Sequence, residues 1–331
     1  TMPLRFSGQP VLFRALMPFV VIGIFTACHA FGAVEAGDPE NVPAKRAPRK
    51  LPAGGPVLAA WVEPDFPFFS SVLDARKAGA DLPKDNLTPR GLVLNLGRDF
   101  WACFDPDLLR MSVVWRGKGV TPKALAPGSY IDGSRKTGTG ETNLPTPVGS
   151  VWLANGIYAG WQTGGTISLH DPREPAPSPE EVGRGPIAES LGRFNALRLL
   201  GDGVVLDYTV GAVRVREENT VAGEGEQATV ERRFEVAPSK SPLRLVLGRV
   251  AEGMAVRVGT APGDAPAVLL SVENAVWTAM VPAHSETLAF VVALAPKEVA
   301  VNPVPKPLAA RPPRPRWPQR SEERRVGKEC R

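Results

Sequence analysis

Six side chains between residues 101 and 161 combine residue types found in ligand-binding sites. Aromatic side chains present flat apolar faces, and paired carboxylates bind cations or exchange protons. The same residues also have structural roles, because aromatic rings fill β-sandwich cores and Asp-Pro-Asp is a common turn sequence. Tyr158 belongs to the same aromatic group. The candidate ligand-binding residues are Trp101, Trp115, Trp152, Trp161, Asp105 and Asp107.

Other reactive residue types are sparse in the body of the chain. Cys103 lies in the aromatic run 101–104, which predicts a buried, inert thiol. His170 and His284 are far apart in the sequence and follow turn-like patterns, so neither predicts a metal site. The sequence contains no CxxCH haem motif, no GxSxG nucleophile motif and no phosphate-binding loop. We therefore assign no catalytic residue, no metal ligand and no cofactor to this chain.

The elements that would position the candidate residues are predominantly β-strands. Residues 109–115 alternate between apolar and mixed positions, which predicts a half-buried strand. Residues 70–79 predict one short helix, and residues 201–203 (Gly-Asp-Gly) predict a hairpin turn. The predicted strands are 92–96, 100–104, 109–115, 151–154, 166–169, 194–200, 204–210, 213–216, 228–236, 243–250, 255–258, 268–272, 276–281 and 288–294.

Composition and strand spacing agree on the fold class. Glycine (33) and proline (35) make up about a fifth of the 331 residues, and the mean hydropathy is near zero. Strands at intervals of about 8–12 residues, without alternating helices, are typical of sandwiches. We predict an all-β protein: an antiparallel β-sandwich or supersandwich with long loops, preceded by a signal peptide. Its β-rich module covers residues 57–295, with two sub-sheets at 57–170 and 187–295.

The N-terminal end predicts export. Arg5 and Arg14 precede an apolar run at residues 15–27, and small residues follow at cleavage distance. We assign residues 1–33 to a signal peptide and the proline-rich residues 34–56 to a linker. Two alternatives are an uncleaved anchor and lipidation at Cys28, which follows a degenerate lipobox. The predicted location is the periplasm or the cell surface, with membrane contact only through the signal or a lipid.

The C-terminal end predicts that the native protein continues beyond this sequence. Residues 296–319 contain eight prolines and indicate a linker to a missing downstream domain. Residues 320–331 resemble a translated sequencing adapter, and the alternative is a native basic tail. Without Arg5, Arg14 and the five basic and three acidic residues of this tail, the net charge falls from +5 to +1. The body therefore gives no indication of nucleic-acid binding.

Three stretches together resemble a known family. They lie at residues 61–69, at residues 86–110, and at residues 192–211, where Gly192-Arg-Phe precedes Gly203-Val-Val-Leu-Asp-Tyr-Thr-Val-Gly211. They resemble the DUF6797 type of N-terminal module in large exported planctomycete and verrucomicrobial proteins. The resemblance implies a downstream propeller similar to sugar or membrane-bound dehydrogenases, often followed by a c-type cytochrome region. Any haem would then belong to the missing C-terminal region.

Three functions are compatible with these observations. The first is a non-catalytic β module that docks the downstream region of its own chain or binds an extracellular ligand such as a glycan. The second is a mutarotase-like or glycan-processing enzyme, which needs a cleft with a histidine or two carboxylates. The third is a part of a periplasmic electron-transfer protein.

Overall fold

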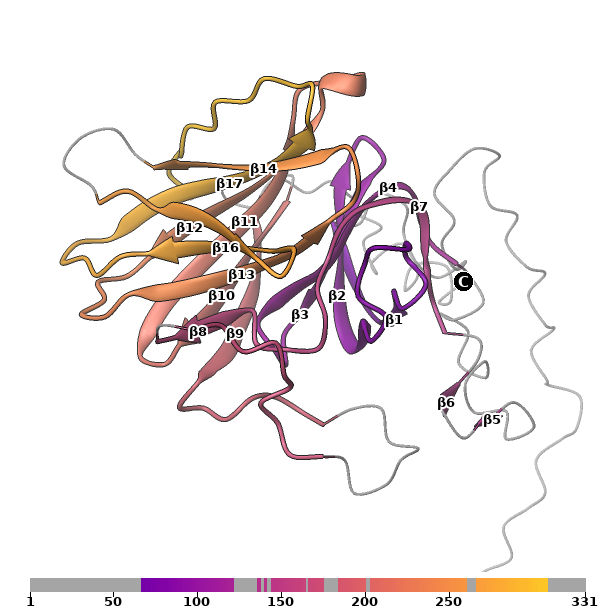
Figure 1. Cartoon of the computed structure of the whole chain (residues 1–331), viewed down its shortest axis with the longest axis horizontal. Helices are drawn as coiled ribbons and strands as arrows, with labels where there is room; N and C mark the ends of the chain where they lie inside the picture. Colours follow the sequence, from indigo (N-terminus) through magenta and orange to yellow (C-terminus); the bar gives the residue numbers. More distant parts are fainter. Residues whose placement is uncertain are drawn as a thin grey trace, which may run out of the picture. The chain divides into compact units, whose positions relative to one another are not determined.

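A computed structural model describes residues 67–121, 136–137, 140–141, 144–164, 166–175, 184–200, 203–260 and 266–308. All of these lie in one compact unit at residues 48–331 (Figure 1). Its strands are β1 (Phe68–Asp74), β2 (Leu87–Gly97), β3 (Phe100–Asp105), β4 (Arg110–Val120), β5 (Lys136–Thr137), β6 (Gly140–Glu141), β7 (Pro147–Ala154), β8 (Trp161–Thr163), β9 (Gly192–Leu200), β10 (Gly203–Val210), β11 (Val213–Ala222), β12 (Thr229–Val236), β13 (Leu243–Val250), β14 (Met254–Thr260), β15 (Leu269–Glu273), β16 (Val276–Val281) and β17 (Leu288–Pro296). A short 3-10 turn, η3 (Gly225–Gln227), precedes β12.

The strands form two large antiparallel sheets and one small hairpin, β5–β6. The first sheet has the order β1-β2-β3-β4-β7-β13-β16-β15, and β8 pairs beside β13. The second sheet has the order β14-β17-β12-β11-β10-β9. The predicted all-β sandwich class is therefore confirmed. Among the described residues, no helix has the length and apolar character needed to cross a membrane.

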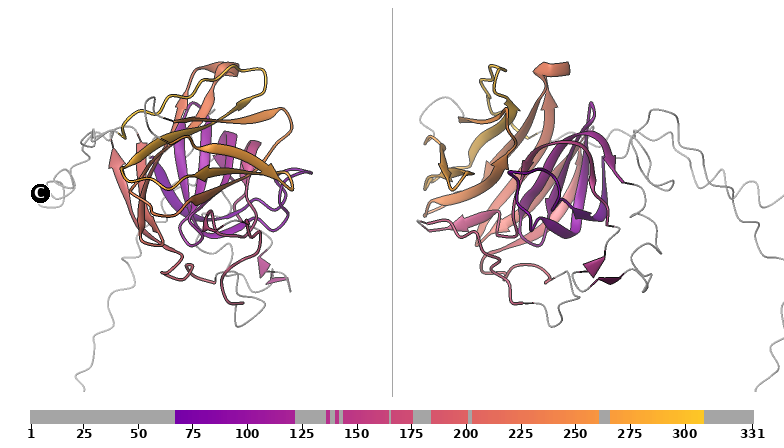
Figure 2. Two further views of the ribbon diagram at one scale, coloured as in Figure 1. Left: turned by 60° about the vertical axis from the view of Figure 1, so that its left-hand side comes forward. Right: turned by 45° about the vertical axis from the view of Figure 1, so that its right-hand side comes forward.

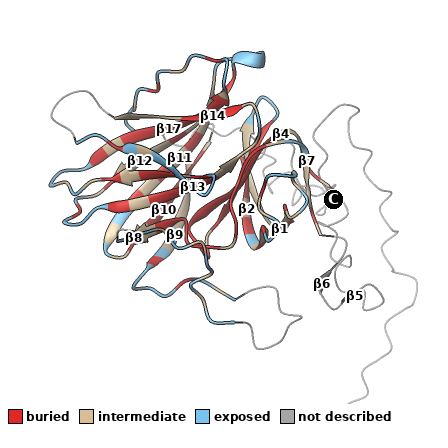
Figure 3. Cartoon of the chain, in the orientation of Figure 1, coloured by how far each residue is buried: buried red, intermediate tan, exposed pale blue. Residues whose placement is uncertain are grey.

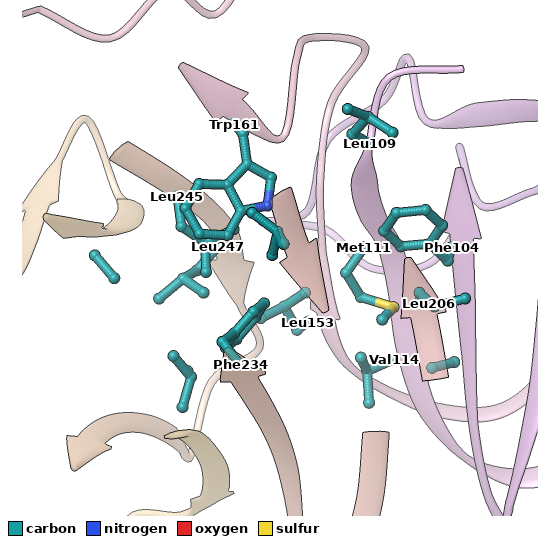
Figure 4. Close-up of a cluster of buried hydrophobic side chains, with 14 of the residues drawn as sticks. Phe104, Leu109, Met111, Val114, Leu153, Trp161, Leu206, Phe234, Leu245 and Leu247 are labelled. Carbon is teal, nitrogen blue, oxygen red and sulfur yellow. The ribbon is translucent and has the colours of Figure 1, made fainter. Parts of the chain in front are cut away.

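The main core lies between the inner faces of the two sheets. Phe104, Met111 and Leu153 come from the first sheet, while Leu206 and Phe234 come from the second (Figure 4). In β11 and β12 of the second sheet, core side chains alternate with more exposed ones, as Figure 3 shows in red and tan. The burial of the two faces against each other is the main stabilising contribution to such a sandwich.

Strand β4 is buried on both faces, which corrects the predicted half-buried pattern. The pairing register with β3 shifts between Cys103 and Phe104, because Ser112 is an extra residue in β4. The bulge reverses the alternation, so Met111 joins the main core whereas Val113 and Trp115 join a second cluster on the opposite face. Leu109 lies in the preceding turn with φ 51° rather than in the strand. The expected burial of these side chains is nonetheless confirmed.

Some predicted elements differ from the structure. Residues 70–79 do not form a helix, because the first half, residues 70–74, belongs to strand β1, which pairs with β2, and the rest lies in the following turn. Residues 166–169 form no strand, whereas the short strand β8 immediately before them was not predicted. The sheets also do not divide at 57–170 and 187–295, because β13, β15 and β16 return to the first sheet.

Several sequence interpretations lie outside the described residues. These are the signal peptide and its alternatives at Cys28, the linker 34–56, the end of the proline-rich segment and the adapter-like tail.

The first part of the proline-rich segment packs on the second sheet instead of leaving it. We call residues 297–308 the strap (Figure 2, yellow). A Cβ atom on Gly259 of β14 would collide with the carbonyl oxygen of Pro303, so only glycine permits this approach. Farther along, the Leu308 amide donates a hydrogen bond to Glu235 of β12 at 3.0 Å.

The strap explains the burial of a sheet face that would otherwise meet water. Val291, Ala293 and Ala295 alternate with the core residues of β17 and therefore point to the outer face, yet all three are fully buried. Val291 pairs with Gly259 directly beneath Pro303. Val299 and Leu308 of the strap are also buried, so the segment is an integral part of the module.

Candidate functional site

Two of the predicted aromatic residues lie in the second cluster, on the outer face of the first sheet. Trp101 and Trp115 are cross-strand neighbours whose rings stack with centroids 6.3 Å apart. Each indole N–H donates to a nearby backbone carbonyl, that of Gly117 at 3.0 Å and that of Gly119 at 2.8 Å. Both side chains are almost completely buried, with their polar atoms satisfied.

The other two predicted tryptophans lie on the opposite, inner face. Trp152 packs edge-on against Phe100, with ring centroids 4.8 Å apart. Trp161 donates its indole N–H to the hydroxyl of Tyr208 in the second sheet at 2.9 Å. The sheet therefore separates the four indoles into two pairs instead of assembling one platform. Their predicted role in ligand binding stays a prediction.

Asp105 forms part of a buried polar network with Arg110. Both side chains are at most 1% exposed, and Arg110 Nε donates to Asp105 Oδ2 at 3.0 Å. The second Asp105 oxygen accepts the backbone amides of Asp107 and Leu108, as in a typical Asx turn. Arg110 also donates to the carbonyl oxygens of Asn155 and Gly156. A buried ion pair with this many additional hydrogen bonds fixes the β3–β4 turn against β7.

Asp107 points to a different partner at the rim of the same turn. Its carboxylate accepts two hydrogen bonds from Arg90, at 3.0 and 2.5 Å. Burial raises the pKa of Asp107 and the charge of Asp105 adds to this shift, whereas Arg90 opposes it. The two aspartates thus have separate arginine partners. The hydrogen bonds of Asp105 match the turn role that the sequence offered as an alternative, whereas the Asp107 carboxylate is paired with Arg90.

A third polar group connects the two sheets inside the main core. Tyr208 accepts the hydrogen bond from Trp161 and donates to Glu217 at 2.8 Å. Glu217 in turn accepts from Nε of Arg232 at 2.8 Å. Burial raises the pKa of Tyr208, and the nearby Glu217 charge has the same effect. This chain of donors and acceptors ties β8 to β10, β11 and β12.

The remaining reactive side chains do not converge on these groups. Cys103 is fully buried in the second cluster, and burial raises the pKa of its thiol. His170 is exposed, and His284 contacts the carbonyl oxygens of Pro282 and Ala237 at 2.7 and 3.0 Å. Within the described ranges, no group of three or more His, Cys, Asp or Glu side chains is arranged to hold a metal ion.

A pocket of about 450 Å³ with both polar and apolar lining residues lies on the outer face of the first sheet. Its walls include the β1–β2 connection, residues 80–85, and its polar lining includes Tyr158 and Arg249. Tyr158 and Val276 of this lining belong to a small third apolar cluster. Sequence reasoning grouped Tyr158 with the tryptophans but missed Asp85 and Arg249. These two residues are far apart in the chain, and no motif links them.

Tyr158 and Gly156 shape the floor of this pocket. The Tyr158 side chain is 4% exposed, and its hydroxyl has no hydrogen-bond partner among the described residues. Burial raises the pKa of Tyr158, and the nearby backbone of Gly156 lowers it by a smaller amount. No hydrogen bond forms between Gly156 and the Tyr158 hydroxyl. A Cβ atom at Gly156 would approach the Tyr158 ring to 2.8 Å and the Asp85 carboxylate to 3.1 Å. Glycine therefore keeps the space between these two side chains open.

The fold and these sites define a β-sandwich module with arginine–carboxylate networks between its strands. Residues 102–217 match the model of the family DUF6797, a domain of unknown function, which confirms the predicted resemblance over these residues. The matched range contains Asp105, Arg110, Tyr158, Tyr208 and Glu217. Searches of the curated proteins and of the solved structures found no match.

Proposed function

We propose that this protein is an exported, non-catalytic β module that anchors the region following it in its own chain. The packing of the strap on the second sheet supports this proposal. A free linker would transmit no orientation, whereas the strap contacts β14 at Pro303 and β12 at Leu308. A region beyond Leu308 would therefore start from a fixed point on the module. The resemblance to DUF6797-type proteins suggests a propeller or cytochrome-type region as this partner.

Spin labelling of the strap tests the anchoring proposal. Lys306→Cys, in a chain with Cys28→Ser and Cys330→Ser, places a nitroxide on an exposed strap position. We expect restricted label motion in this protein. Gly259→Ala should release the label, because the added methyl group displaces Pro303. Gly203→Ala, at a strand glycine of the second sheet whose Cβ would meet no neighbour, is the control for glycine replacement.

Two results would count against anchoring. One is a fully mobile label in the protein with Gly259 intact. The other is identical restricted motion with and without Gly259→Ala, since that would separate the strap from the contact assigned to it. Trypsin cleavage after Lys297 gives an independent measurement, and we expect it to accelerate only when the strap is released.

Binding of an extracellular glycan is a second candidate function. The pocket beside Tyr158 favours it, because a solvent-accessible cavity with several hydrogen-bonding groups suits a polyhydroxylated ligand. The enzymatic and electron-transfer alternatives stay predictions.

A further inference from the structure

The pocket beside Tyr158 contains one arginine that is unpaired within the described chain, Arg249, together with polar groups that can form hydrogen bonds with hydroxyls. We infer that it binds a sugar acid, a polyhydroxylated monocarboxylate such as a hexuronate, either free or at the end of a glycan. This inference rests on the second candidate function and names its ligand class. It is independent of the anchoring role.

Arg249 supplies the positive charge. It lies on β13, pairs with Ala154 of β7 and lines the pocket on the outer face of the sheet. Its half-buried side chain forms no hydrogen bond or ion pair with any residue that the structure describes, although most arginines in the described part are paired. A guanidinium that is available and partly shielded from water is well suited to a bidentate carboxylate.

Tyr158 supplies a neutral polar group next to this cation. Its buried hydroxyl has no partner among the described residues and lies within electrostatic range of Arg249 and Asp85. A buried hydroxyl without a partner is destabilising, and this one adjoins the pocket, where a hydrogen bond to a bound ligand would remove that cost. A ligand hydroxyl or carboxylate would satisfy it.

Acceptors and a second cation complete the lining. One oxygen of Asp85 accepts the Ile157 amide at 3.1 Å, and no bond occupies the other within the described chain. Lys84 donates to the carbonyl oxygen of Gly79, and Asp81 is exposed at the wall. Free carboxylate oxygens accept from sugar hydroxyls.

The charge pattern selects among anions. Asp81 and Asp85 would repel a doubly charged phosphate, whereas a single carboxylate can face Arg249 and present its hydroxyls to the acidic side. The volume of about 450 Å³ is sufficient for a monosaccharide, since small-molecule sites span roughly 300–1,000 Å³. A neutral sugar would leave Arg249 without a partner.

Calorimetric titration of the full chain with glucuronate, glucose and a disaccharide ending in glucuronate tests the inference. We expect binding of glucuronate, at least ~10-fold weaker binding of glucose, and ~10-fold weaker glucuronate binding after Arg249→Gln. Arg193→Gln, at an exposed arginine of the second sheet, is the matched control and should leave affinity unchanged. Binding of the disaccharide alone would still support the ligand class and assign it to a glycan end.

Tyr158→Phe separates a binding role from a structural one. Removing an unpartnered hydroxyl should leave the thermal midpoint equal or higher, while glucuronate affinity falls several-fold. A lower midpoint with unchanged affinity would overturn the assignment of Tyr158. Equal affinity for glucose and glucuronate, unaffected by Arg249→Gln, would overturn the acid class but leave glycan binding standing. Absence of binding for every sugar up to 10 mM would overturn both.

Discussion

At the scale of single residues, the buried ion pair of Asp105 and Arg110 joins two side chains that are close in the sequence. Asp105 and Arg110 are five residues apart, and the tight turn between β3 and β4 brings them together inside the protein. The sequence showed the turn chemistry of Asp105, because Asx turns depend on local spacing. It did not show that Arg110 would be buried, since an arginine in an alternating strand is normally expected on the exposed face.

Replacing one member of this pair should destabilise the protein strongly. Asp105→Asn leaves the Arg110 charge buried without its counter-ion, which costs about 3–5 kcal/mol in comparable pairs. The free energy of unfolding from urea titration measures the loss. Asp99→Asn, in an exposed hairpin turn, should change it by less than about 0.5 kcal/mol. Equal stability of the two variants would contradict a structural role for Asp105.

The Cys103 thiol should be unreactive while the protein is folded. It is fully buried, and burial raises its pKa, so the thiolate that attacks disulfide reagents is scarce. In a chain with Cys28→Ser and Cys330→Ser, we expect no reaction with a disulfide reagent at neutral pH. Guanidinium should release one thiol equivalent. Rapid labelling without denaturant would show that the second cluster is open to solvent.

At the scale of elements, local sequence patterns predicted most of the strands but did not predict which strands pair with each other. The Gly-Asp-Gly sequence and the flanking β-branched residues indicated the β9–β10 hairpin, and the two strands do pair. Residues 70–74 were assigned to a helix because a short apolar run does not distinguish helix from strand. Strand β8 has three residues, too few for a periodic signal, and it forms because β13 offers a free edge to Trp161.

Asp207 on strand β10 of the second sheet predicts a specific acid dependence of stability. Asp207 of β10 accepts hydrogen bonds from Arg214 of β11 and Arg198 of β9, and these arginines lower its pKa, the Arg214 bond most of all. The folded pKa is below the unfolded value of about 3.9, so the stabilisation is complete above about pH 4 and is lost as the pH falls through the folded pKa. Asp207→Asn should remove this part of the acid dependence.

Thermal midpoints between about pH 2 and 6 measure that effect. We expect the variant to be less stable than the parent at pH 6 and the difference to shrink towards pH 2. Asp107 has the opposite shift, because its raised pKa makes its charged form unfavourable in the folded protein. Asp107→Asn should therefore not reproduce the result. A pH-independent difference for Asp207→Asn would mean that its role is steric.

At the scale of the whole molecule, the two sheets are joined by polar as well as apolar contacts. The hydrogen bond from Trp161 to Tyr208 crosses the core, and Glu217 and Arg232 extend it along the second sheet. The candidate site was harder to predict than this core. Asp85, Tyr158 and Arg249 meet only because the β1–β2 connection covers the outer face of the first sheet.

Trp161→Phe should weaken the contact between the sheets. The variant keeps an aromatic ring but removes the N–H donor to Tyr208, which costs about 1–3 kcal/mol with the lost volume. Urea unfolding measures the change. Trp277→Phe, at a partly buried position, is the matched control and should cost less. A larger loss for Trp277→Phe would contradict the importance of the inter-sheet hydrogen bond.

The return of β13, β15 and β16 to the first sheet has a consequence for how the chain folds. Strand β13 pairs with β7 nearly a hundred residues earlier, and the second sheet is assembled from the segments on both sides of it. Several strand pairs therefore join segments that are far apart in the sequence, a topology typical of folding in milliseconds to seconds. Residues 102–217 contain neither β13 nor β12, so the segment that matches the family model lacks one of the two neighbours of β7 and one of the two neighbours of β11. Such an interleaved path favours a single cooperative transition in which neither sheet persists without the other.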